Sequence, residues 1–139
     1  MIEHVIRNEE DTEKFGIELA KRLNAGDVIA LVGELGTGKT TLTKSIAKGL
    51  GIKQMITSPT FTIVSEYYGG RLPLFHFDVY RLSNEDEAFE VGVEEYFDKG
   101  GVCIIEWADI IAGILPDDTK CIFLERGKTD GERIFKCTF

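Results

Sequence analysis

One stretch decides the fold: Val28-Ile-Ala-Leu-Val32, then Gly33-Glu-Leu-Gly-Thr-Gly-Lys-Thr40, then Thr41-Leu-Thr-Lys-Ser-Ile-Ala-Lys-Gly-Leu50. The first part is a short apolar run, which is typical of a fully buried strand. The second part matches the pattern G-x-x-x-x-G-K-[ST]. The third part places apolar residues four positions apart, as an amphipathic helix does. A strand, a glycine-rich loop and a helix in this order predict a phosphate-binding P-loop.

The residue types in this loop suit the binding of phosphate. Gly33, Gly36 and Gly38 can adopt positive φ, which lets backbone N–H groups converge on phosphate oxygens. The N-terminus of the following helix favours an anion at the same point. We expect Lys39 to add positive charge at the β- and γ-phosphates, and the Thr40 hydroxyl to bind Mg²⁺.

Length and composition limit the classes of protein that fit. The chain has 139 residues, so we expect a single domain over residues 1–139, built around the P-loop. Its net charge of −8 argues against tight binding of nucleic acid by the protein alone. The sequence shows no signal peptide and no long apolar segment, so we expect a cytoplasmic protein without membrane contact.

The three cysteines lack metal-ligand spacing, and we expect buried, reduced thiols. Cys121 and Cys137 are placed to face each other across a terminal hairpin, at a separation too wide for a disulfide.

Outside the central stretch, the apolar pattern predicts further strands and helices. Residues 1–7 resemble a short edge strand, and residues 8–23 a helix that Asn8 caps. Turn signals at Gly69-Gly70 and Asp130-Gly131 separate alternating runs. Two antiparallel hairpins are therefore expected beside a parallel P-loop core, residues 62–68 with 72–79 and residues 119–126 with 132–139.

Two apolar runs end on a carboxylate. The run before Asp78 and the run before Glu106 both read as strands, and ligands of doubly wound sheets lie beyond the carboxyl ends of strands. We therefore expect Glu106 to point into the same crevice as Lys39 and Asp78. Asp78 is suited to hold Mg²⁺ or its water opposite Thr40, or alternatively to serve as a turn residue.

Two aromatic residues near these carboxylates have open roles. His76 fits a packed strand position as well as it fits a catalytic one. Trp107 is interpreted as core or edge packing.

Residues 84–99 are rich in Asp and Glu. Gly92 is expected to divide this segment into two short helices. The apolar face is assigned to Phe89, Val93, Tyr96 and Phe97. The acidic side chains fit a solvated face, or alternatively a docking surface for a basic partner.

Four segments together resemble the TsaE (YjeE) family of small bacterial P-loop ATPases, which are needed to make threonylcarbamoyladenosine (t6A) in tRNA. These segments are the loop from Gly33 to Thr40, Ser58-Pro-Thr-Phe61, His76-Phe-Asp-Val-Tyr-Arg-Leu82 and Ile105-Glu-Trp107. The resemblance covers nearly the whole chain. It implies an α/β, P-loop NTPase-like mixed sheet covered by helices, with ATP/ADP and Mg²⁺ as ligands. It also implies partnership with a TsaD–TsaB type complex, through which the protein meets tRNA only indirectly.

The resemblance also implies roles for individual residues. Thr40 and Glu106 would bind Mg²⁺, and Asp78 would act on a metal-bound or attacking water. Thr60 would form a switch-type element near the γ-phosphate. Glu9 and Thr12 would lie near the nucleotide base. The phosphates would be bound by Leu35, Gly36, Thr37, Gly38, Lys39, Thr40 and Thr41.

The expected activity is Mg²⁺-dependent ATP hydrolysis, slow alone and dependent on the partner. Hydrolysis requires a held γ-phosphate, neutralised charge and an in-line water, so Lys39 and Asp78 are catalytic candidates, and the resemblance adds Thr60. No residue is an obvious arginine finger, and Arg81 or a partner residue is the candidate. Two alternatives stay open: a small-molecule kinase, and a nucleotide-gated switch module with negligible turnover.

Overall fold

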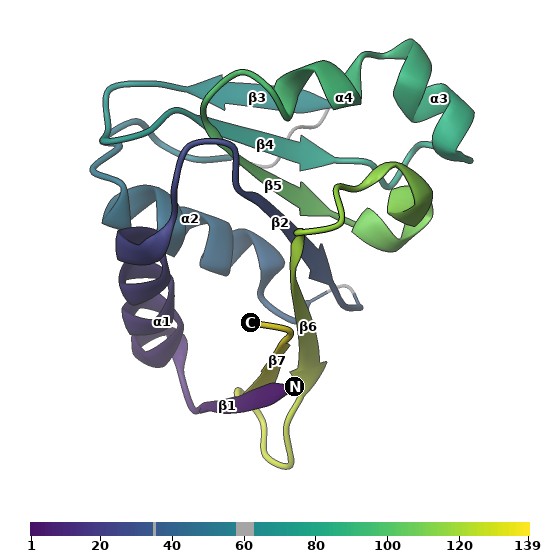
Figure 1. The fold of residues 1–139 in the computed structure, drawn as a ribbon. Helices are drawn as coiled ribbons and strands as arrows, with labels where there is room; N and C mark the ends of the chain where they lie inside the picture. The colour runs from purple at the N-terminus through teal and green to yellow at the C-terminus, as the bar shows by residue number, and fades with distance from the viewer. Residues whose placement is uncertain (35, 58–62) are drawn as a thin grey trace.

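The computed structural model describes residues 1–34, 36–57 and 63–139, and these residues form one seven-stranded mixed sheet (Figure 1). The strand order is β1-β7-β6-β2-β5-β4-β3. The four central strands, β6, β2, β5 and β4, are parallel, and the β1–β7, β7–β6 and β4–β3 pairs are antiparallel. The strands are β1 (Ile2–Ile6), β2 (Val28–Val32), β3 (Val64–Tyr67), β4 (Leu74–Asp78), β5 (Val102–Glu106), β6 (Lys120–Arg126) and β7 (Arg133–Cys137). The predicted α/β fold, with a parallel core and antiparallel hairpins, is confirmed.

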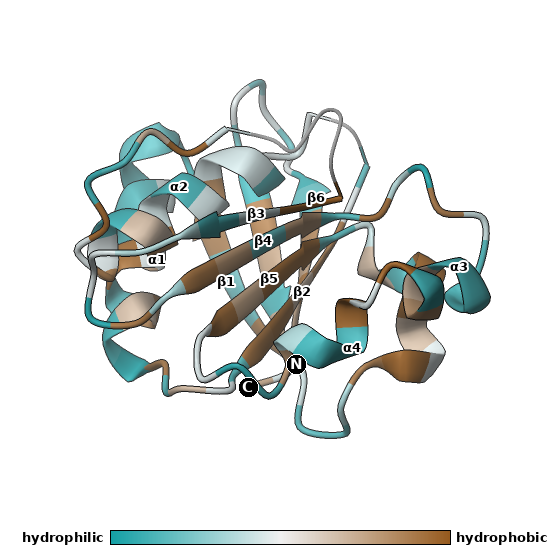
Figure 2. Cartoon of the chain, turned by 90° about the horizontal axis from the view of Figure 1, so that it is seen from above, coloured by the Kyte–Doolittle hydropathy of each residue, from teal (hydrophilic) through white to brown (hydrophobic). Residues whose placement is uncertain are grey.

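Helices cover both faces of this sheet (Figure 1). The helices are α1 (Glu9–Arg22), α2 (Lys39–Gly49), α3 (Glu85–Glu90), α4 (Val93–Tyr96) and the 3₁₀ segment η1 (Ala108–Ile114). Helices α1 and α2 enclose one apolar core with the sheet, and α3, α4 and η1 enclose the other. Figure 2 shows the apolar strands between these layers. Strands β2 and β5, at the middle of the sheet, are buried on both faces, which explains their continuous apolar runs.

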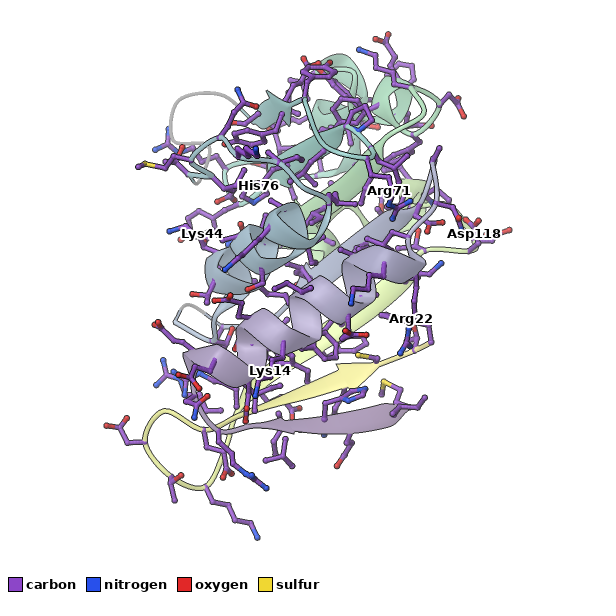
Figure 3. The ribbon with its side chains drawn as sticks, turned by 90° about the vertical axis from the view of Figure 1, so that its left-hand side faces the viewer. Lys14, Arg22, Lys44, Arg71, His76 and Asp118 are labelled. Atoms are coloured by element: carbon purple, nitrogen blue, oxygen red, sulfur yellow. The ribbon has the colours of Figure 1, made fainter. Side chains whose placement is uncertain are left out.

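Helix α1 is held in place at both ends and along its length. At its start, the Asn8 side chain accepts a hydrogen bond from the Asp11 backbone N–H at 2.9 Å. Near its end, Arg71 donates to the carbonyls of Ala20 and Leu23 (Figure 3). Between them, α1 packs closely on α2. This packing fixes the first turn of α1 beside the glycine-rich loop.

The prediction for residues 84–99 is partly wrong. Gly92 does separate two short helices, with φ of 79°. However, Phe89 is 70% exposed, whereas Ala88 and Val93 are buried. The turn at Gly92 changes the chain direction between α3 and α4, so Phe89 and Val93 do not share one helical face. The residue assigned to the core therefore lies on the surface.

The cysteines are free thiols, as predicted, and Cys103 and Cys137 are buried, but Cys121 is only half-buried. Cys121 and Cys137 also do not face each other. The β6–β7 register pairs Cys137 with Ile122. Because successive side chains of a strand point to opposite faces, this one-residue offset places the two thiols on opposite faces of the sheet.

None of the helices among the described residues is both long and apolar enough to cross a membrane.

Candidate functional site

A pocket of about 460 Å³ lies where the parallel strands end. It is lined by ten residues that the sequence assigns to a binding or catalytic role: Glu9, Thr12, Gly36, Thr37, Gly38, Lys39, Thr40, Thr41, Asp78 and Glu106. Gly33, which was also expected to adopt positive φ in the loop, is not among the described glycines with positive φ and does not line this pocket. Two further candidates, Leu35 and Thr60, lie outside the described residues. The assigned residues therefore share one cavity, although they come from four separate elements and the glycine-rich loop.

The glycine-rich loop and the start of α2 form one wall of the pocket. Gly36 and Gly38 have φ of 81° and 99°, a region that glycine enters without steric cost. Gly38 is the N-cap of α2, and no side chain caps this helix end. An uncapped helix start offers N–H groups and a partial positive charge to an anion. This wall is therefore suited to receive phosphate.

Lys39 opens α2 and is buried at the floor of the pocket. Its Nζ donates to the carbonyl oxygens of Gly33 and Glu34 and lies 4.2 Å from the ring centroid of Trp107. Burial lowers the pKa of Lys39, and the nearby carboxylates of Glu106, Asp78 and Asp109 act in the opposite direction. Because the effect of burial is the larger one, the pKa of Lys39 lies below its ordinary value.

Two carboxylates form the opposite wall. Asp78 ends β4 and Glu106 ends β5, and the parallel register places these residues side by side. Glu106 is only 4% exposed, and its Oε2 lies 2.5 Å from His76 Nε2. Asp78 Oδ1 accepts a hydrogen bond from the Tyr80 backbone N–H at 3.0 Å. Asp78 therefore lines the pocket and also stabilises the turn after β4, so both roles considered for it are present.

Trp107 was expected only to pack in the core or at an edge, but it lines the pocket and contacts Lys39. It is the only non-glycine residue in the described part of the chain with positive φ, at 62°. Its ring packs against Tyr80, with centroids 4.9 Å apart, and covers Lys39. Strained backbone of this kind gathers at functional sites. No local sequence pattern marks a left-handed tryptophan, so the contact with Lys39 could not be predicted.

The far end of the pocket is built by both ends of the chain. Asn8, Glu9 and Thr12 come from the start of α1, and Gly131 and Arg133 come from the β6–β7 turn and β7. Arg133 Nη2 donates to the carbonyl of Gly36 at 3.1 Å, which ties β7 to the glycine-rich loop.

Arg133 was not among the predicted site residues, although the turn signal at Gly131 marks the hairpin that carries it. Arg81, the named candidate for an arginine finger, is exposed and is not among the described residues that line the pocket.

The oxygen ligands in the pocket fit Mg²⁺ better than a softer metal. Carboxylate and hydroxyl oxygens are offered by Glu106, Asp78 and Thr40. Within residues 1–34, 36–57 and 63–139, no three His, Cys, Asp or Glu side chains are grouped to hold a metal ion. Mg²⁺ is commonly bound by one or two carboxylates together with substrate phosphates, and this donor set is of that kind.

Comparisons with known proteins agree on one family. The family described as threonylcarbamoyl adenosine biosynthesis protein TsaE matches residues 6–135. The tRNA threonylcarbamoyladenosine biosynthesis protein TsaE of Bacillus subtilis is 46% identical over 127 residues, which are 91% of this chain and 79% of the relative. The protein of the same name from Treponema pallidum is 44% identical over 129 residues, 93% of this chain and 94% of the relative.

A solved structure is also similar. The crystal structure of YdiB from Bacillus subtilis superposes with a TM-score of 0.80 at 41% sequence identity. The match covers 96% of this chain and 82% of that chain.

Proposed function

Because this chain belongs to the TsaE family of threonylcarbamoyl adenosine biosynthesis proteins, we propose that it is a Mg²⁺-dependent ATPase that serves t6A modification of tRNA. It would act with a TsaD–TsaB type complex and meet tRNA only through that complex. The relatives that carry the TsaE name share most of this chain at up to 46% identity, which supports a common process.

One observation carries the proposed chemistry: a phosphate-type cradle and two strand-end carboxylates meet in one pocket. The uncapped start of α2 and Lys39 supply positive charge for the β- and γ-phosphates. Asp78 and Glu106 lie across from them in register. Phosphoryl transfer needs both kinds of group within one site, because the phosphates must be neutralised and the attacking water must be placed.

Each side chain has a defined task in this proposal. Lys39 would exchange its contacts with the Gly33 and Glu34 carbonyls for phosphate oxygens. Thr40 and Glu106 would hold Mg²⁺, which supplies charge neutralisation on the phosphates when it is bound. Asp78 would orient a water molecule, either on the metal or in line with the γ-phosphate. Thr60 and Leu35 keep their predicted roles at the γ-phosphate and in the loop.

The test is ATP hydrolysis by the purified protein with and without Mg²⁺, alone and with the TsaD–TsaB pair. We expect slow turnover alone and stimulation by the pair. Glu106→Gln should abolish Mg²⁺-dependent turnover, while Glu94→Gln, an exposed carboxylate on α4, should leave it unchanged.

Two results would contradict the proposal and select its alternatives. Tight ATP binding without turnover, even with the pair present, would favour a nucleotide-gated switch. A phosphorylated small molecule recovered from a metabolite mixture would favour a kinase.

A further inference from the structure

His76 is a buried polar residue at the centre of β4, and its surroundings do not explain it by packing alone. Its side chain, labelled in Figure 3, has no exposure to solvent. Its neighbours along the strand, Phe75 and Phe77, belong to the apolar core on the opposite face. In the described part of the chain, its Nδ1 is the one buried side-chain nitrogen or oxygen without a hydrogen-bond partner.

An imidazole in this place is costly. A buried polar atom without a partner has lost its hydrogen bond to water without a replacement, whereas an apolar side chain of similar size would carry no such penalty. The one hydrogen bond that His76 makes joins its Nε2 to Glu106 Oε2 over 2.5 Å. An apolar residue could not make this bond. The bond to Glu106 is therefore the reason we consider for a histidine at this position.

The bond constrains the Glu106 carboxylate. A carboxylate oxygen accepts, so Nε2 is the donor, and Oε2 is held against β4. Because the carboxylate is planar, fixing one oxygen also fixes the direction of the other. Glu106 Oε1 is thereby set at one orientation in a side chain that lines the pocket. Groups behind a metal ligand commonly act in this way, and their loss weakens metal binding about 10- to 100-fold.

We propose that His76 is a positioning residue that holds Glu106 in the orientation in which it binds Mg²⁺. The inference rests on the assignment of Glu106 as a metal ligand in the proposed function. His76 itself is not among the described residues that line the pocket.

The test measures Mn²⁺ affinity of the protein–ADP complex by electron paramagnetic resonance, with Mn²⁺ as the probe for the Mg²⁺ site. His76→Leu keeps the bulk of the side chain and removes the donor. We expect Mn²⁺ affinity to fall by about tenfold or more, while ADP affinity in EDTA, measured by calorimetry, stays unchanged. A residue needed only for folding would lower both affinities or neither.

A pair of amide variants keeps the test decisive if His76→Leu does not fold. The side-chain nitrogen of His76→Gln can reach the place of Nε2, whereas that of His76→Asn reaches only the place of Nδ1. We expect His76→Gln to bind Mn²⁺ nearly as the unchanged protein does, and His76→Asn to bind it as weakly as His76→Leu. Equal Mn²⁺ affinity in the Gln and Asn variants would overturn the positioning role.

Glu106→Gln separates this inference from the proposed function. If Glu106→Gln leaves Mn²⁺ affinity unchanged, the metal assignment fails and the positioning role fails with it. If Glu106→Gln weakens Mn²⁺ binding but the Asn and Leu variants do not, only the positioning role is overturned. We expect His76→Leu to have no further effect on Mn²⁺ affinity when it is added to Glu106→Gln.

Discussion

At the scale of single residues, burial sets the reactivity of the cysteines. It raises the pKa of Cys103 to about 12 and that of Cys137 to about 11, and it raises the pKa of Cys121 as well. Because the thiolate is the reactive species, we expect slow labelling of the folded protein by a disulfide reagent at pH 8, with half-buried Cys121 first. In denaturant all three thiols should react rapidly. Peptide mapping identifies the labelled residues, and rapid labelling of Cys103 in the folded protein would contradict this expectation.

Arg133 gives a second prediction at this scale. Its guanidinium bridges to Gly36 and lines the pocket, so it is placed to add charge for a bound nucleotide. We expect Arg133→Ala to weaken ADP binding by about tenfold or more, since hydrogen bonds to charged groups contribute about 1.5–3 kcal/mol. Titration followed by Trp107 fluorescence measures this, because Trp107 is the single tryptophan and lies in the pocket. Arg22→Ala, at the exposed end of α1, is the matched control, and an equal effect of both variants would refute the role.

The residues of the pocket were not equally predictable. Asp78 and Glu106 end apolar runs, so the rule that parallel strands end at one edge was enough to bring them together. Trp107 and Arg133 follow no such rule. The position of Trp107 depends on a left-handed backbone angle. The position of Arg133 depends on β7 lying within reach of the glycine-rich loop. Both are set by tertiary packing, which local pattern does not record.

At the scale of elements, the contact between α1 and α2 depends on glycine. A Cβ added at Gly16 would lie 2.4 Å from Ser45 Cβ. Alanine favours helix by about 1 kcal/mol over glycine, but overpacking costs up to about 3 kcal/mol. We therefore expect Gly16→Ala to lower the melting temperature and to weaken ADP binding, because α1 carries Glu9 and Thr12 to the pocket. Lys14→Ala, on the exposed face of α1, is the control, and a melting temperature raised by Gly16→Ala would contradict the close packing (Figure 3).

A pair of phenylalanines tests the corrected arrangement of α3 and α4. Phe77 is 1% exposed and Phe89 is 70% exposed. We expect Phe77→Ala to cost about 3–5 kcal/mol of unfolding free energy and Phe89→Ser to change it by less than about 0.5 kcal/mol. Chemical denaturation measures both values. A large loss in Phe89→Ser would restore the sequence-based assignment of Phe89 to the core.

The elements themselves were largely readable from the sequence, and the exception has a physical cause. Glycine turns, caps and apolar periods located the hairpins, α1 and the strand–loop–helix unit. Helical spacing continued across Gly92 predicts a buried Phe89, but the positive φ of Gly92 ends that spacing. A break in a helix can be expected from sequence, but the direction of the chain after it cannot.

At the scale of the whole molecule, the pocket joins segments from Ile6 to Arg133. A ligand that binds only when all of them are in place stabilises the complete fold. We expect ADP with Mg²⁺ to raise the melting temperature by several degrees, since a ligand at 100 times its dissociation constant adds about 2.7 kcal/mol. Circular dichroism measures the shift, and Lys39→Ala should show none. An equal shift in Lys39→Ala would place the binding site elsewhere.

The pairing of β1 with β7 has a consequence for the speed of folding. The two strands meet from opposite ends of the sequence, and their contact has the greatest sequence separation of any strand pair in the described sheet (Figure 1). Contacts of this kind raise contact order and slow folding, because a long stretch of chain must be closed before they form. During synthesis the first strand has no partner until the last has been made. We therefore expect the ability to bind a nucleotide to arise late in folding, after β2, the glycine-rich loop and α2 have formed.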